Sequence, residues 1–134
     1  MAGLYELGVR DIMGAGVDLE NASIYVMLVD TNSYTADLDS DNYYDDIPNA
    51  ARIAEAVLVG KTLDGTTFRA TDTTFVSVTT GQNVDAVVLF LNTDYEDTST
   101  LIAYIDNAPE FPITTDGDDI TIVWDTGANG IFKL

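Results

Sequence analysis

The chain has 134 residues, enough for one domain built around a single hydrophobic core. It contains no cysteine and no histidine, which excludes disulfide frameworks, thiol nucleophiles, imidazole-based triads and the usual zinc ligands. With 23 acidic and five basic residues the formal net charge is −18, so we expect neither nucleic-acid nor membrane binding. The first residues lack the features of a signal peptide and no apolar run could span a bilayer, so we expect cytoplasmic synthesis without export.

The N-terminal segment gives a mixed signal. Its apolar residues fit one face of a short helix, but four glycines oppose that assignment: Gly3, Gly8, Gly14 and Gly16. We predict a loosely structured arm over residues 1–20 with one or two helical turns. The arm packs either on its own domain, residues 21–134, or on a neighbouring subunit.

Short strands with turn signals between them fill the rest of the chain. Residues 47–59 are ambiguous, because alanines behind Pro48 favour a helix whereas residues 53–59 suit a strand; we predict a helical turn and then a strand. Asp64-Gly65 predicts a hairpin tip, and two prolines exclude a central strand over residues 107–112. The other predicted strands are Ile24–Asp30, Thr67–Ala70, Thr74–Val78, Ala86–Leu91, Leu101–Ile105, Ile120–Trp124 and Ile131–Leu134.

The hairpin over residues 84–106 is the most informative stretch. Its two strands are joined by the acidic link Thr93–Ser99, and neither strand has a polar side, so both of its faces should be covered. Ile24–Val29 and Ile120–Trp124 are also apolar on both faces. This excess of apolar surface suggests one sheet that is covered by the arm and loops or by an identical subunit. The fold class we predict is all-β, an antiparallel β-sandwich or jelly-roll-like domain, and we expect a homo-oligomer.

A metal-ligating pattern stands in the acidic loop over residues 32–46. Asp37, Asp39, Asp41 and Asp45 supply the hard oxygen ligands that calcium prefers, although glycine and glutamate are missing from the diagnostic sixth and twelfth positions of an EF-hand loop. The two interpretations are a calcium site of another kind and a solvated acidic loop. Four tyrosines in the acidic loops could stack on sugars, anchor a partner protein or hold their own loop: Tyr34, Tyr43, Tyr44 and Tyr95.

Several short motifs resemble a family of small structural proteins of tailed bacteriophages, of the head-decoration or cement kind. The strongest lies over residues 99–106, Ser-Thr-Leu-Ile-Ala-Tyr-Ile-Asp, and the likeness extends over most of the chain from about residue 20. The other motifs that carry it are Leu28-Val29-Asp30 with Tyr34, Asp46-Ile47-Pro48, Phe68-Arg69-Ala70-Thr71-Asp72, Pro112-Ile113-Thr114, Asp116-Gly117, Trp124 and Gly130-Ile131-Phe132-Lys133-Leu134.

The resemblance implies a non-enzymatic virion protein that is made in the bacterial cytoplasm and carried on the particle surface. Its expected partners are the major capsid protein or other virion proteins, with a trimer as the favoured homo-oligomer and no cofactor other than calcium. The alternative is a phage adhesin, a receptor- or glycan-binding β-sandwich module that uses the tyrosine-rich acidic loops with or without calcium.

Overall fold

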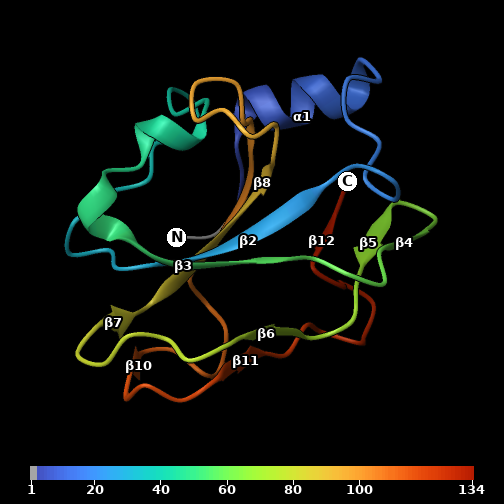
Figure 1. Ribbon diagram of the computed structural model, residues 1–134. Coiled ribbons are helices and arrows are strands. Elements are labelled where there is room, and N and C mark those ends of the chain that lie inside the picture. The colour runs from blue at the N-terminus through green and yellow to red at the C-terminus, as the bar shows by residue number, and fades with distance from the viewer. Residues whose placement is uncertain (1–2) are drawn as a thin grey trace.

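The computed structural model describes residues 3–134 and is organised around one five-stranded sheet (Figure 1). The strands follow the order β1 (Gly3–Leu4), β9 (Leu101–Ile105), β8 (Ala86–Leu91), β2 (Ile24–Val29) and β3 (Arg52–Val57), with every pair antiparallel. The predicted hairpin of residues 84–106 therefore exists and supplies two of the three inner strands. The prediction of an all-β, antiparallel, sandwich-like fold is confirmed.

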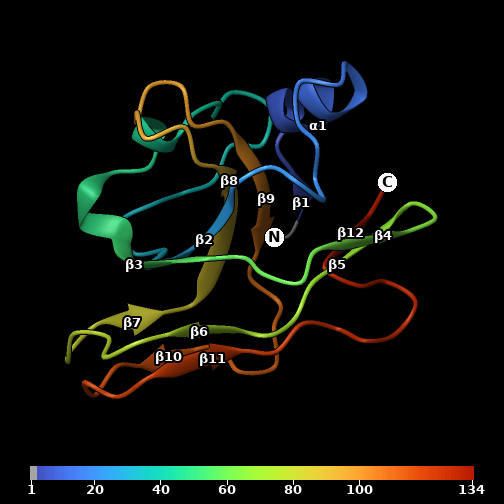
Figure 2. The same ribbon diagram turned by 45° about the vertical axis from the view of Figure 1, so that its right-hand side comes forward.

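Three small sheets form a second layer against one face of the main sheet (Figure 2). They are β12 (Phe132–Lys133) with β5 (Thr67–Arg69) and β4 (Thr62–Asp64), β11 (Ile120–Ile122) with β6 (Thr73–Phe75), and β10 (Ile113–Thr114) with β7 (Asn83–Val84). Val26, Leu28 and Leu89 of the main sheet belong to one buried cluster with Phe68 and Phe75 of this layer. Burial of these side chains holds the layers together.

The opposite face of the main sheet is covered by the segment between β2 and β3. Two short 3-10 helices, η1 (Tyr44–Asp46) and η2 (Asn49–Ala51), interrupt this segment. Its Tyr34 and Ile47 lie in a second buried cluster with Met27, Val88 and Phe90 of the sheet. Both faces of the hairpin are therefore covered, as predicted, and the chain itself supplies the cover.

The N-terminal segment is built into the same sheet from Gly3 onward. Tyr5 is fully buried, and α1 (Glu6–Met13) packs on β9. Gly8, whose presence argued against a helix, lies where the backbone of α1 approaches β9 closely. A Cβ there would lie 2.4 Å from the carbonyl oxygen of Leu101. The predicted arm thus folds over its own domain, and residues 1 and 2 lie outside the described part.

Other sequence predictions are mostly confirmed, with one correction. A helical turn followed by a strand occurs in the ambiguous stretch as η2 and β3, and Gly65 takes a positive φ of 63° in the turn between β4 and β5. The two-sided apolar strand predicted over Ile120–Trp124 is wrong. The strand there has three residues and pairs with β6 outside the main sheet, and Thr121 and Val123 are exposed. The apolar residues of that stretch partly form the buried side of an ordinary strand whose alternate residues are exposed.

Candidate functional site

The two acidic loops that stood out in the sequence, residues 37–46 and 93–99, meet at one end of the molecule (Figure 1). The backbone N–H groups of Tyr44 and Asp45 donate to the carbonyl oxygens of Ser99 and Glu96, at 2.8 and 3.2 Å. Tyr43 also forms an isolated antiparallel bridge with Thr100. These main-chain bonds fix one loop against the other, and we call the surface formed by residues 37–46 and 93–99 the acidic face.

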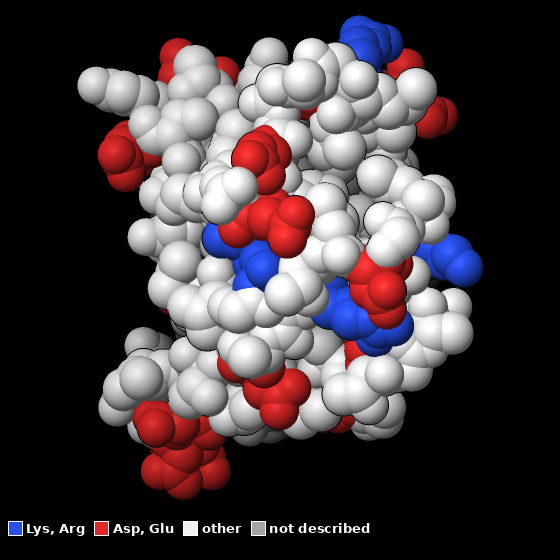
Figure 3. Space-filling view, turned by 90° about the vertical axis from the view of Figure 1, so that its right-hand side faces the viewer, with Lys and Arg blue, Asp and Glu red and all other residues white. Residues whose placement is uncertain are grey.

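The acidic face carries carboxylates and no lysine or arginine of its own. In contrast, Arg69 and Lys133 belong to the β12–β5–β4 sheet and Lys61 immediately precedes β4. Figure 3 shows basic side chains gathered on the side of the molecule that carries this sheet. The negative charge of the acidic face is therefore set apart from most of the positive charge. Its carboxylates are Asp37, Asp39, Asp41, Asp45, Asp46, Asp94, Glu96 and Asp97.

The predicted calcium ligands are not assembled into a coordination shell. Asp37 Oδ1 accepts the backbone N–H groups of Asp39 and Ser40, and Asp41 Oδ2 accepts the backbone N–H of Asp37. Asp39 and Asp45 are exposed, the latter in η1. Within residues 3–134 no group of three or more acidic side chains is placed to hold a metal ion. Asp37 and Asp41 thus shape the turn, and calcium binding stays a prediction.

Tyr34, one of the four tyrosines of the acidic loops, holds its own loop, which is one of the predicted alternatives. Tyr34 is buried, its hydroxyl donates to Asp41 Oδ2 at 2.7 Å, and it lies 2.8 Å from the hydroxyl of Tyr5. Because the single hydroxyl hydrogen of Tyr34 goes to Asp41, the hydroxyl of Tyr5 donates to Tyr34. Burial raises the pKa of both tyrosines, so both remain protonated donors. This chain of hydrogen bonds ties the acidic loop to the N-terminal segment.

Tyr44 and Arg52 hold the acidic face against the main sheet. The Tyr44 ring packs edge-on against the Phe90 ring, with 5.1 Å between the ring centroids. The Arg52 guanidinium lies 4.3 Å from the centroid of the Tyr44 ring, a cation–π contact. Arg52 also reaches Glu96 at 3.2 Å. The Tyr44 hydroxyl donates to Glu55, and burial together with this hydrogen bond raises the pKa of Tyr44 to about 12. Arg52 therefore bridges both acidic loops to β3.

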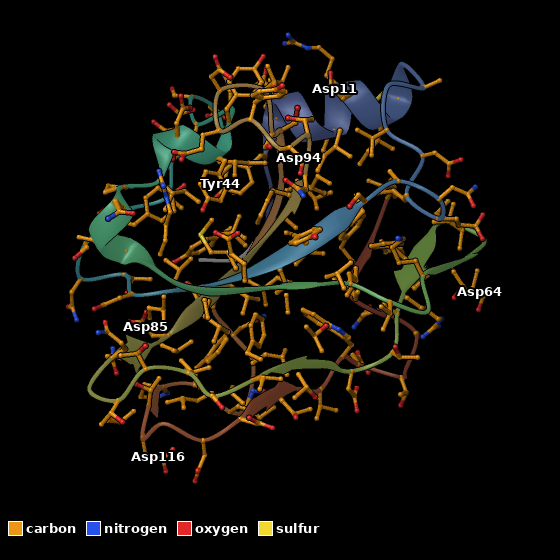
Figure 4. The ribbon with its side chains drawn as sticks, viewed as in Figure 1. Asp11, Tyr44, Asp64, Asp85, Asp94 and Asp116 are labelled. Atoms are coloured by element: carbon orange, nitrogen blue, oxygen red, sulfur yellow. The ribbon has the colours of Figure 1, made fainter. Side chains whose placement is uncertain are left out.

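A small cleft opens between the two loops. It has a volume of about 260 Å³, and its lining includes Tyr44, Glu55, Asp94 and Tyr95. Figure 4 shows Tyr44 and Asp94 at this end of the molecule, with Asp116 at the other. Tyr95 is 70% exposed and is the most accessible of the four predicted tyrosines, whereas Tyr43 and Tyr44 are half-buried. The site offers acceptor oxygens and aromatic surface, which suits recognition of hydrogen-bond donors or positive charge.

Comparison with models of known protein families finds no match, and comparison with curated protein sequences finds none either. No helix within residues 3–134 combines the length and apolar character needed to cross a membrane. The fold and the site together define an antiparallel β protein in which main-chain hydrogen bonds hold two acidic loops against each other.

Sequence reasoning found both acidic loops but not the contacts that organise them. The Tyr5–Tyr34–Asp41 chain joins the N-terminal segment to the acidic loop, and Tyr5 and Tyr34 are 29 residues apart, so no local pattern indicates it. Arg52 gave a weak signal, being one of only five basic residues in the chain and following an acidic loop.

Proposed function

We propose that this protein is a non-enzymatic structural component of a tailed-bacteriophage virion, a head decoration protein that stabilises the capsid from the particle surface. The observation that carries the proposal is the fixed juxtaposition of residues 37–46 and 93–99 at one end of a β-rich scaffold. Such a surface suits a protein whose task is to bind other proteins rather than to transform a substrate. The phage resemblance of the sequence points to the same class.

Preorganisation of the acidic face supports a binding role. Main-chain bonds, the Arg52 bridge and the buried tyrosine pair all hold the loops before any partner arrives. A surface that is already ordered loses less conformational entropy on binding than a mobile loop. Many copies bound side by side on a capsid also multiply modest individual affinities.

Charge indicates the kind of partner. Carboxylates without neighbouring lysines suit a positively charged surface on the major capsid protein or on another virion protein. Because such contacts are screened by salt, attachment should weaken as ionic strength rises. Nucleic acid is disfavoured by the net charge of −18.

We also propose a homo-oligomer, with a trimer favoured. An uncovered face of the main sheet no longer supports this proposal. The surplus apolar surface of the main sheet is buried by the chain itself. Large exposed apolar side chains still occur near β3 and β6, namely Val57, Val59 and Val76. Light scattering after size-exclusion chromatography gives the subunit number directly, and a monomer at micromolar concentration would contradict the oligomer.

Co-sedimentation with purified capsids of the phage that encodes the chain tests the function. We expect wild-type protein to bind and to raise the temperature at which the capsids break down. The exposed pair Asp45→Asn/Asp97→Asn should bind several-fold more weakly, because two favourable charges are lost. Glu20→Gln/Asp118→Asn is the matched control, since both residues are exposed, lie outside the acidic face and change the net charge equally. No binding by wild-type protein, or equal loss in both variants, would contradict the proposal.

A second candidate is an adhesin that binds glycans. The observation in its favour is the exposed ring of Tyr95 beside the cleft, where Asn92 and Asp94 offer polar groups for sugar hydroxyls. A glycan array probed with and without calcium separates the two candidates. Saturable glycan binding that Tyr95→Ala abolishes, together with no capsid binding, would favour the adhesin.

A further inference from the structure

A second, larger cavity lies away from the acidic face, between the main sheet and the loop that follows β11. Its volume is about 580 Å³, within the range of small-molecule sites. The segments that line it come from β8, from the connection after β9 and from residues 122–131, which lie near one another in Figure 2. Nothing in the proposed function uses this cavity.

The cavity has an apolar floor and a polar mouth. Val87, Ile122 and Trp124 are buried core residues that form part of its lining. The exposed lining residues are mostly polar: Asn107, Asp125, Thr126 and Asn129. Of the described residues that line the cavity, none is lysine or arginine, so no side chain there carries a positive charge to pair with an anionic ligand.

The cavity wall is largely preformed. The loop over residues 123–131 is tied to β5, because Arg69 donates to the carbonyl oxygen of Gly127 at 2.6 Å and Thr67 donates to that of Ala128 at 3.3 Å. Gly130 has a φ of 56° and sits where a Cβ would come within 2.6 Å of the Phe68 carbonyl oxygen. A ligand therefore meets a wall whose backbone is already fixed.

Glu110 supplies the chemical signal. Its Oε1 accepts the backbone N–H of Val123 at 3.2 Å, whereas its Oε2 is buried and has no hydrogen-bond partner. Among residues 3–134, this is the one buried side-chain nitrogen or oxygen without a partner. A buried carboxylate oxygen that lacks a donor is costly, so a donor that reaches it stabilises the site. Glu110 is itself one of the residues that line the cavity.

We propose that this cavity binds a primary ammonium group carried on an aliphatic chain, with Glu110 as its acceptor. The ammonium supplies charge-assisted donors to the carboxylate, and the alkyl chain covers the apolar floor beside Val87 and Ile122. The net charge of −18 raises the local concentration of cations around the protein. The ammonium can come from a free small amine or from a lysine side chain of another protein.

Trp124 makes the test direct, since it is the single tryptophan of the chain and lines the cavity. Wild-type protein is titrated with n-pentylamine at constant ionic strength while tryptophan fluorescence is recorded, with 1-pentanol and pentanoate as the neutral and anionic matches. We expect saturable binding of the amine, and binding at least about tenfold weaker in Glu110→Gln, because a hydrogen bond to a charged group is lost. Glu20→Gln, the same change at an exposed site outside the cavity, should bind like wild type.

Several results would overturn the proposal: no saturable response to amine up to about 10 mM, equal binding of 1-pentanol, or unchanged affinity in Glu110→Gln. Comparison of the amine with pentanol needs only wild-type protein, so the proposal remains testable if Glu110→Gln does not fold. Nα-acetyl-lysine methylamide distinguishes the two sources of the ammonium. Binding as tight as that of n-pentylamine supports a lysine side chain, and binding of n-pentylamine alone supports a free small amine.

Discussion

Removing the Tyr34 hydroxyl should cost more stability than any other single-atom deletion in the acidic loop. Tyr34→Phe deletes the group that links Tyr5, 2.8 Å away, to the Asp41 carboxylate, 2.7 Å away. The lost hydrogen bond to a charged group is worth about 1.5–3 kcal/mol, and the Tyr5 hydroxyl, fully buried, is left without an acceptor at a further cost of about 1 kcal/mol or more. We therefore expect a loss of about 2.5–4 kcal/mol in the free energy of unfolding.

Urea denaturation at pH 7, followed by the fluorescence of Trp124, measures this loss as a lower midpoint with an unchanged slope. In a chain of this length it corresponds to a fall of roughly 9–14 °C in melting temperature. Tyr25→Phe is the control, because it removes a hydroxyl from a half-buried ring that packs on Phe90 and should cost less than about 0.5 kcal/mol.

The double variant Tyr5→Phe/Tyr34→Phe sharpens the test. With both hydroxyls gone no buried donor is stranded, so the double variant should be no less stable than Tyr34→Phe alone. Equal, small losses in Tyr34→Phe and Tyr25→Phe would refute the reasoning. Strictly additive losses at Tyr5 and Tyr34 would refute the coupling between them.

Three further outcomes follow from the structure. Burial raises the pKa of Tyr44 and of Tyr104 to about 12, so folding favours their protonated forms. The free energy of unfolding should therefore hold up to about pH 10, where a tyrosine of the unfolded chain ionises, and fall as pH rises toward 12. The urea midpoint as a function of pH measures this fall, and a flat profile would contradict it. Gly8→Ala should lower the free energy of unfolding by about 1–3 kcal/mol because its Cβ meets the Leu101 carbonyl oxygen, whereas a gain of about 1 kcal/mol, as in an unobstructed helix, would show that α1 is not pressed against β9. Calcium binding by the acidic loop is tested by the melting temperature of the protein: a rise with calcium that magnesium at equal concentration does not give would support the predicted site, and equal responses to the two ions would favour a solvated loop in which Asp37 and Asp41 accept backbone N–H groups.

The sequence predicted strands well where hydrophobic burial is strong. Ala86–Leu91 and Leu101–Ile105 are continuous apolar runs, and they form inner strands that are buried on both faces. The strands of the second layer have only two or three residues, and apart from the local β4–β5 hairpin they pair with strands far along the chain. Phe132, for example, pairs with Phe68, and the residues near either one in the sequence do not predict this pairing.

The sequence indicates the two acidic loops of the candidate site but not that they meet in the fold. Acidic loops are visible in composition, so residues 37–46 and 93–99 stood out early. That a loop tyrosine packs on its own domain was among the alternatives, but the sequence did not single out Tyr34, because its neighbours are polar and its partner Tyr5 lies 29 residues away. Gly8 misled for a related reason, since a glycine that permits close packing of a helix on a strand looks the same in sequence as one that breaks a helix.

The order of strands in the main sheet has a consequence for how the chain acquires its structure. β1 pairs with β9 about a hundred residues later, and β2 pairs with β8 across about sixty. On the ribosome, the apolar strand Ile24–Val29 emerges long before its neighbour Ala86–Leu91, and Gly3–Leu4 waits longer still. Topologies dominated by such distant pairings fold slowly, over milliseconds to seconds, and during that time expose apolar, unpaired strands that can aggregate. We infer that the high negative charge, whatever it does in the folded protein, also keeps nascent copies apart until the sheet can close.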